Sequence, residues 1–274
     1  MNATMIGLLT ETPLHPGASE SAGAIDLPVQ RERATGYPVM VASSLKGALR
    51  NYAESHWDDE HLNQVFGNPD GVAQIGISDA RLLLLPVRSL HNAFTWITCS
   101  YLLERLQRDW ILSGYQASWS IPPVAPGHVL MASPPAEPAI FLEEFSYVVD
   151  TSPSVSAMGQ DLARLMAHDS ARARLTQQLA ILSDEDFRYF AQYGLPVNAR
   201  NQLDDNKISR NLWYEEQLPP DTLLYYLLLS ANPSPGLDAL VELIMSAPYV
   251  QLGGNESIGQ GICIQSPWRK ADVS

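Results

Sequence analysis

A proline- and glycine-rich stretch near the N-terminus constrains the fold more than any other feature of the sequence. It runs from Thr12 to Val39, directly after a short apolar segment. Its structure-breaking residues are Pro13, Pro16, Gly17, Gly23, Pro28, Gly36 and Pro38. Proline removes a backbone donor and glycine disfavours helices and strands, so the pattern predicts a loop. Loops of this length inside a compact domain are usually functional or disordered.

Strand and helix patterns alternate on both sides of this loop. Strands are predicted at residues 4–11, 75–87, 139–149, 222–230, 249–252 and 262–265. Helices are predicted from Ser43 or Ser44, which we expect to be the N-cap, and at residues 98–113, 161–182, 184–193 and 237–245. Residues 122–138 are predicted to be a proline-rich connection, and residues 194–213 a polar hairpin. This order indicates an α+β, ferredoxin-like sandwich, and without repeats or linkers we expect a single domain over residues 1–274.

The charge distribution is uneven. The chain has 17 Lys and Arg against 30 Asp and Glu, a formal net charge of −13. Such acidity argues against a free-standing nucleic-acid binder, because phosphate contacts need clustered cations. Between Leu27 and Arg50, however, four basic residues face one acidic residue, a local charge of +3. A basic patch on an acidic body fits a protein with one RNA groove and protein partners elsewhere, and it equally fits an acidic enzyme.

Several protein classes are disfavoured by composition. The N-terminus has no basic stretch before its apolar run, and the longest apolar runs, such as 81–87 and 223–229, are too short to cross a bilayer. Cys99 and Cys263 are too few for a disulfide framework or a cysteine-based zinc site. We therefore expect a cytoplasmic protein without a membrane partner.

A glycine-rich segment, residues 253–261, lies between two apolar strands near the C-terminus. Glycines permit positive φ and close approach of another backbone, and consecutive amides can hold a phosphate. No Lys-Ser/Thr pair follows, so this is not a Walker loop. A tight structural turn and a phosphate-binding loop both remain open from the sequence.

The segment 43–50, SSLKGALR, has the composition of an anion site at a helix N-terminus. Free amides and serine hydroxyls would bind the anion, and Lys46, expected in the first turn, would add charge. The alternative is a solvated lysine on an exposed helix face.

The long loop also carries His15 and Asp26, followed by Arg31 and Arg33. RNA can be cleaved by its own 2′-hydroxyl when deprotonation is assisted and charge on the phosphate is stabilised. A carboxylate, an imidazole and two guanidiniums suit that chemistry. Judged from the residues alone, a capping or solvated aspartate is the alternative.

These features occur together, and in this order, in a family that the sequence resembles. The motifs are His15, the run Asp26–Arg33 (DLPVQRER), Thr35–Pro38 (TGYP), SSLKGALR and the loop 253–261. Together they are similar to the RAMP superfamily. Further motifs resemble the backbone subunits of the Cmr (type III-B CRISPR) effector over essentially the whole chain. They are LPVRS at 85–89, FTWITC at 94–99, LEEF at 142–145, SDEDF at 183–187 and NLWYEEQLP at 211–219.

The resemblance implies a fold and an activity. Such subunits have a ferredoxin-like (RRM-like) core and a protruding β-hairpin thumb, and they stack head to tail along a guide RNA with other Cmr subunits. Each thumb displaces a base pair between guide and complementary target RNA. The target is cut beside it with a divalent metal, Mg²⁺ or Mn²⁺, by 2′-hydroxyl attack, leaving a 2′,3′-cyclic phosphate.

The resemblance also assigns residues. Asp26 matches the family's catalytic aspartate, with His15 and Glu215 as further residues linked to cleavage. The expected RNA contacts are Arg31, Arg33, Ser43, Ser44, Lys46, Arg50, Arg200, Lys207, Gly253, Gly254, Asn255, Ser257, Gly259 and Gly261. The thumb departs from relatives, because residues 196–207 (PVNARNQLDDNK) are less apolar and less basic than usual.

Two other functions remain open. The chain could be a scaffold subunit that binds guide RNA without cleaving, or a free-standing RAMP ribonuclease that processes guide RNA with a histidine base. Head-to-tail stacking is a non-closing contact, so much acidic surface would face neighbouring copies. We therefore expect Arg31, Arg33, Lys46 and the glycine-rich loop to share one face.

Overall fold

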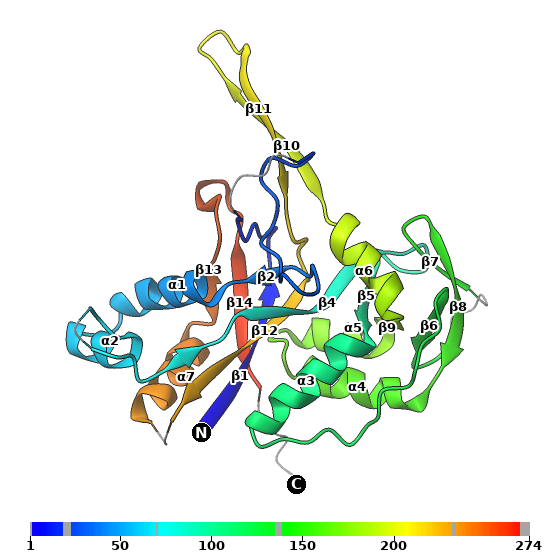
Figure 1. Cartoon of the computed structure of the whole chain (residues 1–274), viewed down its shortest axis with the longest axis horizontal. Coiled ribbons are helices and arrows are strands. Elements are labelled where there is room, and N and C mark those ends of the chain that lie inside the picture. Colours follow the sequence, from blue (N-terminus) through cyan, green and yellow to red (C-terminus); the bar gives the residue numbers. More distant parts are fainter. Residues whose placement is uncertain (1, 19–22, 70, 135–138, 232–233, 269–274) are drawn as a thin grey trace.

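The computed structural model describes residues 2–18, 23–69, 71–134, 139–231 and 234–268. Within these ranges a large, mostly antiparallel sheet runs through the molecule, with helices on both faces and a long hairpin projecting from one side (Figure 1). The fold is α+β, as predicted.

The large sheet is built from distant parts of the sequence. One half consists, in order, of β13 (Tyr249–Gln251), β14 (Ile262–Pro267), β1 (Asn2–Thr10), β12 (Leu223–Ser230) and β4 (Ala80–Arg88). The other half continues with β5 (Phe94–Cys99), β9 (Leu179–Leu182), β6 (His128–Met131), β8 (Phe145–Thr151) and β7 (Ala139–Leu142). Two short strands, β2 (Val39–Met40) and β3 (Gly76–Ile77), pair with β4 and β12. Of the named pairs, β5–β9 and β6–β8 are parallel.

Helices pack on both faces because the central strands are apolar on both sides. The helices are α1 (Ala42–Glu54), α2 (Asp59–Phe66), α3 (Ser100–Leu112), α4 (Pro153–Ala163), α5 (Asp169–Gln178), α6 (Asp184–Tyr193) and α7 (Pro235–Ser246). In β1, Ile6 belongs to one core with Leu45 of α1, whereas Met5 belongs to a second core with Trp110 of α3. Successive side chains of a strand point to opposite faces, so one apolar strand supplies two cores. None of the helices described is long and apolar enough to cross a membrane.

The predicted polar hairpin is present, a few residues later than expected. Strands β10 (Val197–Leu203) and β11 (Ser209–Glu216) pair with each other, with Val197 opposite Glu216 at the base. They form a separate two-stranded sheet that projects from the body (Figure 1). We call residues 197–216 the thumb.

The prediction of one helix over residues 161–182 is wrong. This stretch contains the end of α4, then α5, then the strand β9. All four residues of β9, Leu179–Leu182, are buried, and the strand pairs with β5 in parallel. In the sequence, a short apolar run such as this one can be a buried strand or the end of a helix, and its periodicity does not distinguish the two.

Other boundaries also differ. The proline-rich connection at 122–138 contains the strand β6, and the strand predicted at 139–149 is a hairpin of β7 and β8 that turns at Glu143, with φ 48°. The strand predicted at 75–87 is split into β3 and β4. Each added strand lies in the large sheet, where pairing with distant segments stabilises runs too short to form strands alone.

Candidate functional site

The described part of the N-terminal loop packs against the base of the thumb. Leu27 bridges Glu215 in parallel, and Leu14 bridges Leu218 in antiparallel fashion. The Leu27 amide donates to the Tyr214 carbonyl at 3.0 Å, and the Glu216 amide donates to the Leu27 carbonyl at 3.0 Å. The segment around Leu27 therefore adds to the outer edge of β11.

Asp26 sits at the start of this added segment. Its Oδ2 accepts a hydrogen bond from the Tyr214 amide at 2.8 Å, and the residue is exposed. This bond fixes the carboxylate in place while solvent still reaches it. A fixed and accessible carboxylate beside a projecting hairpin can accept a proton from a bound ligand.

His15 is buried and anchored. Its Nδ1 lies 2.7 Å from the Glu216 carbonyl oxygen. A carbonyl only accepts, so Nδ1 carries the proton and Nε2 is left to exchange one. His15 is 8 % exposed, so a large ligand has little access to the imidazole.

Glu215 is the centre of a polar cluster. Its Oε1 accepts hydrogen bonds from Gln217 at 2.6 Å and Asn255 at 2.5 Å, and Arg200 lies at 3.5 Å. Burial acts to raise the pKa of Glu215. The bonds from the two amide side chains and the positive potential of His15 and Arg200 outweigh burial and hold that pKa below the ordinary value. Glu215 therefore stays ionised and ties the thumb to the glycine-rich loop through Asn255.

Arg31 is partly exposed, but its guanidinium is engaged by the protein. Its guanidinium donates to the Glu216 carboxylate at 2.6 Å and to the carbonyl oxygens of Gly36 at 2.9 Å and Ala191 at 2.6 Å. Arg50 is similarly engaged, with the Gly67 carbonyl at 2.7 Å. A phosphate contact by either side chain would compete with these bonds. Sequence patterns show the charges but not the distant partners that satisfy them.

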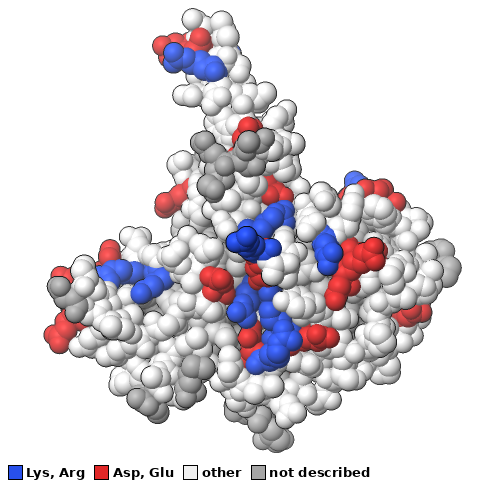
Figure 2. Space-filling model, in the orientation of Figure 1, with Lys and Arg blue, Asp and Glu red and all other residues white. Residues whose placement is uncertain are grey.

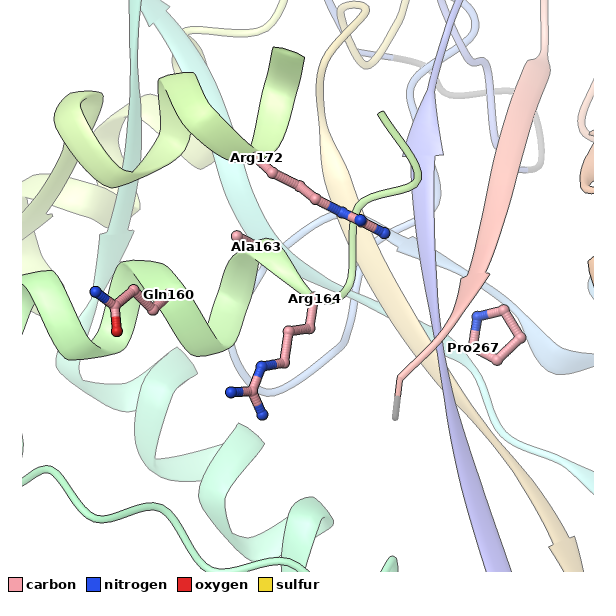
Figure 3. Close-up of a pocket in the computed structure, with 5 residues that line it drawn as sticks. All are labelled: Gln160, Ala163, Arg164, Arg172 and Pro267. Atoms are coloured by element: carbon pink, nitrogen blue, oxygen red, sulfur yellow. The ribbon is translucent and has the colours of Figure 1, made fainter. Parts of the chain in front are cut away.

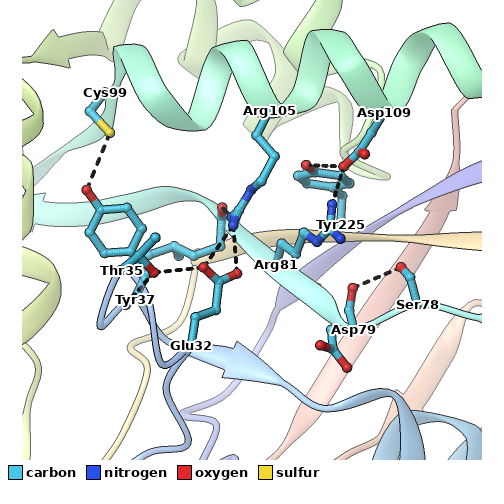
Figure 4. Close-up of polar contacts among 11 residues, drawn as sticks. Glu32, Thr35, Tyr37, Ser78, Asp79, Arg81, Cys99, Arg105, Asp109 and Tyr225 are labelled. Atoms are coloured by element: carbon cyan, nitrogen blue, oxygen red, sulfur yellow. Dashed lines mark hydrogen bonds and ion pairs between the residues drawn. The ribbon is translucent and has the colours of Figure 1, made fainter.

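Arg33 lies in an arginine-lined groove of about 680 Å³ between the N-terminal loop and α3. Figure 2 shows basic side chains gathered below the thumb on this face. Arg105 pairs with Glu32 at 2.7 Å, and Arg81 pairs with Asp109 at 2.6 Å, both drawn in Figure 4. Arg31, bonded to Glu216, also lines the groove. The last two arginines, Arg33 and Arg108, are exposed, and neither forms an ion pair with another described residue.

The start of α1 differs from the prediction. The helix begins at Ala42 with Val41 as N-cap, so Ser43 and Ser44 are exposed residues of the first turn and not caps. The Ala42 amide donates instead to Asp79 Oδ1 at 2.7 Å. A carboxylate brought in from beyond β3 thus satisfies the helix terminus, a role that serines often have. Lys46 lies in the second turn and is partly exposed.

A second groove, of about 490 Å³, separates α1 from the glycine-rich loop. Its lining includes Ser44, Ala48 and Asn51 of the helix and Gly253 and Gly254 of the loop. Val41 lines the arginine groove and Ser44 lines this one, so the two grooves flank the start of α1. Arg31 and Arg33 line one groove and the glycine-rich loop lines the other, so they lie on the two sides of the helix start and the expected single face is not observed.

Both interpretations of the glycine-rich loop have support, at different residues. Gly253 has φ +69°, and a Cβ there would overlap the His15 carbonyl oxygen; Gly261 has φ +80°, and a Cβ would overlap the Leu252 carbonyl oxygen. These two glycines are needed for the turn. A Cβ on Gly254 would meet nothing within 4 Å. Space beside the Gly254 backbone is what a bound phosphate needs.

The other loop and thumb residues are mostly exposed. Asn255 and Gly259 are left-handed, with φ 68° and 76°, and flank the exposed Ser257. Lys207 is exposed in the thumb turn, with φ 61°. Arg200 differs, because its guanidinium lies toward Glu215 along the thumb and is 24 % exposed.

A metal ion held by protein ligands alone does not fit the described residues. No three His, Cys, Asp or Glu side chains among them gather closely enough to hold one. Mg²⁺ commonly keeps several waters and binds one or two carboxylates plus substrate phosphates. The exposed Asp26 fits that second kind of site.

A separate cavity lies away from these residues. It has a volume of about 310 Å³ and is lined by Gln160, Ala163, Arg164, Arg172 and Pro267 (Figure 3). Arg172 donates to the Met166 carbonyl at 2.7 Å and pairs with Asp169 at 3.2 Å. No predicted site residue lines this cavity, and its arginines are engaged locally.

Three residues of the site were not predicted from the sequence. Glu216 and Gln217 follow Glu215 in β11, and Gln260 belongs to the glycine-rich loop. Gln217 Nε2 donates to Gln260 Oε1 at 3.0 Å, and Glu216 binds Arg31. The sequence shows Glu215 and Glu216 side by side, but no neighbouring residue indicates that both carboxylates are buried.

Comparison with known proteins defines the class. The model of the RAMP superfamily matches residues 8–264, so the chain belongs to that superfamily. It is 32 % identical to the CRISPR system Cmr endoribonuclease Cmr4 of Pyrococcus furiosus, over 95 % of this chain and 94 % of the relative. It is 26 % identical to the CRISPR system CMR subunit Cmr4 of Saccharolobus solfataricus, over 92 % of each.

Solved structures agree. The crystal structure of oligomeric Cmr4 from Pyrococcus furiosus superposes with a TM-score of 0.81 at 28 % identity, covering 99 % of this chain and 100 % of that one. A cryo-EM structure of the type III-B Cmr-beta bound to cognate target RNA gives a TM-score of 0.77 at 24 % identity, covering 97 % of each chain, and shares the fold.

Proposed function

We propose that this chain is a repeated backbone subunit of a type III-B CRISPR effector, which binds guide RNA and cleaves complementary target RNA in the cytoplasm. The observation that carries the proposal is Asp26, an exposed carboxylate fixed to the thumb base by the Tyr214 amide. Similarity to an endoribonuclease of the same superfamily over 95 % of the chain supports it.

The proposed core is the half of the sheet nearest α1. Strands β1, β4, β12 and β14, taken in chain order as one to four, lie in the spatial order four-one-three-two. Helix α1 follows the first of these strands and α7 follows the third. This βαββαβ arrangement is the ferredoxin-like pattern, and the thumb is an insertion before its third strand.

The groove between α1 and the glycine-rich loop is the proposed path for the guide backbone. It offers open space beside the Gly254 backbone, whose amide is bonded to the His15 carbonyl at 3.4 Å, and the hydroxyl of the exposed Ser44. Gly47 in α1 supports this path, because a Cβ there would also meet nothing within 4 Å. Glycine costs about 1 kcal/mol in a helix interior, so its presence on an open helix face suits close approach of a ligand. Lys46 is partly exposed on the same helix but does not line the groove, since it is two positions from both Ser44 and Ala48.

Target cleavage would take place beside the thumb. Asp26 accepts the proton of the attacking 2′-hydroxyl, and its own position is held by the Tyr214 amide. The 2′-oxygen bonds to phosphorus, the bond from phosphorus to the 5′-oxygen breaks, and that oxygen takes a proton from water, which leaves a 2′,3′-cyclic phosphate and a 5′-hydroxyl. In the alternative role, Asp26 would instead hold a divalent ion together with water and RNA phosphates, and that ion would supply positive charge to the phosphate as negative charge develops.

The acidic body fits a repeated subunit. Copies stacked head to tail, and other Cmr subunits, would cover much of the surface that carries the −13 charge. A free-standing guide-processing ribonuclease that uses a histidine base fits less well, because His15 is buried and bonded to the Glu216 carbonyl.

The test is Asp26→Asn in the assembled complex, which keeps the shape of the side chain. We expect target cleavage to fall by about 10²–10⁴-fold, the usual contribution of general acid–base catalysis, with target binding unchanged. Asp205→Asn, in the exposed thumb turn, is the matched control and should cleave normally. Cleavage by Asp26→Asn at the wild-type rate and positions would show that the chain is a scaffold, or that another residue is the base.

A further inference from the structure

Glu216 and Arg31 form an ion pair between segments that are distant in the sequence, with the glutamate buried and the arginine side chain 23 % exposed. The guanidinium lies 2.6 Å from Glu216 Oε1, and the glutamate side chain is 4 % exposed. The other carboxylate oxygen accepts the Val29 amide at 3.0 Å. Both oxygens are therefore used to hold the loop that follows Asp26.

The same guanidinium also reaches α6, the helix that precedes the thumb. It donates to the carbonyl oxygens of Ala191 at 2.6 Å and Gln192 at 3.5 Å, near the end of α6. The chain enters the thumb shortly after α6 and leaves it at Glu216. Arg31 thus joins the entry and the exit of the hairpin.

The backbone of Glu216 makes further contacts to the candidate site. Its amide donates to the Leu27 carbonyl at 3.0 Å, and its carbonyl accepts from His15 Nδ1 at 2.7 Å. Glu216 therefore touches the segments that carry both Asp26 and His15. A thumb that moved relative to the body would move Asp26 with it.

We propose that the Arg31–Glu216 pair positions Asp26 on the base of the thumb, and that Arg31 does not bind RNA. The proposal rests on the proposed function, since it assumes that Asp26 takes part in cleavage. Both are positioning residues, because the Glu216 side chain is buried and the Arg31 guanidinium, although it lines the arginine groove, is already bonded to Glu216 and to backbone carbonyls. The pair would keep the cleaving carboxylate at a constant offset from the thumb in every copy.

The experiment uses the assembled complex with guide RNA and compares Glu216→Gln, Arg31→Gln and the double variant. We expect the single-turnover rate at saturating target to fall by about 10- to 100-fold, since displacement of a catalytic group by about 1 Å has effects of that size. Target affinity should stay within about twofold of the wild-type value, because the contacts to RNA phosphates are unchanged. The double variant should be no slower than Arg31→Gln alone, because the two residues act as a unit.

Arg33→Gln is the matched control, since Arg33 is exposed and only two residues away. Replacing an arginine that binds RNA should lower the affinity for target RNA and the salt dependence of that affinity, and leave the saturating rate unchanged. If Arg31→Gln behaves in that way, or if the pair variants cleave at the wild-type rate, the proposal is wrong. Glu216→Gln retains an acceptor for the Val29 amide, and assembly of each variant is checked by gel filtration.

A variant that merely fails to fold would give a different set of measurements from a variant that misplaces Asp26. It would lower assembly and target affinity together with the rate, and that outcome would also contradict a positioning role. Failure of the proposed function is separable, because Asp26→Asn would then cleave normally. An inactive Asp26→Asn together with fully active pair variants would overturn the positioning role alone.

Discussion

Replacement of Arg105 by methionine should destabilise the fold strongly. Its guanidinium makes two bonds of 2.7 and 2.9 Å to the Glu32 carboxylate, and the two side chains are 8 % and 19 % exposed. Figure 4 shows this pair joining α3 to the N-terminal loop. Removing one partner leaves a mostly buried carboxylate without its cation, which costs about 3–5 kcal/mol. Glu32 keeps a bond from Thr35 at 2.7 Å, so we expect about 3 kcal/mol.

The assay is thermal and urea unfolding of the isolated chain. A loss of about 3 kcal/mol corresponds to a decrease in Tm of about 6–12 °C for a chain of this size. Arg108→Met is the matched control, because Arg108 is exposed one turn further along α3. It should change stability by less than about 0.5 kcal/mol.

A double variant separates loss of the ion pair from loss of packing. Glu32→Gln combined with Arg105→Met removes both charges, and should recover part of the loss because no unpaired charge remains. Equal, small effects of Arg105→Met and Arg108→Met would refute the reasoning. So would a double variant as unstable as the sum of the single ones.

Two further predictions concern the glycine-rich loop and the thumb base. Gly253→Ala combines a positive φ with overlap of the His15 carbonyl, so it should displace the glycine-rich loop and lower guide affinity, which filter binding measures. Gly254→Ala has space for a methyl group, so it should leave the stability of the free chain unchanged in thermal unfolding. The pKa of Glu215 is below its ordinary value, so its ionised form stabilises the folded state above the unfolded pKa, and that contribution is lost as pH falls through the folded pKa. The stability gap between the wild type and Glu215→Gln, measured by urea unfolding, should therefore be constant near neutral pH and shrink below about pH 4.5, the unperturbed value; a gap that widens in acid would contradict this sign.

The local pattern of the sequence determined the elements that have strong signals of their own. The first strand, the helix beginning near Ser43, the polar hairpin and the glycine-rich loop all lie close to their predicted positions. Periodicity and turn residues act over a few positions, so they are readable without tertiary context. The family resemblance added Asp26, which the residues alone left as one loop carboxylate among several.

The tertiary structure decided which charged groups are available. Arg31 and Arg33 are nearly adjacent in the sequence, yet the first is bonded to Glu216, 185 residues away, and the second is exposed. Buried strands such as β9 were missed for a related reason, since their partners come from distant segments. The sequence shows which charges and apolar runs exist. Whether a charge meets solvent or a buried partner depends on contacts made only when the chain is folded.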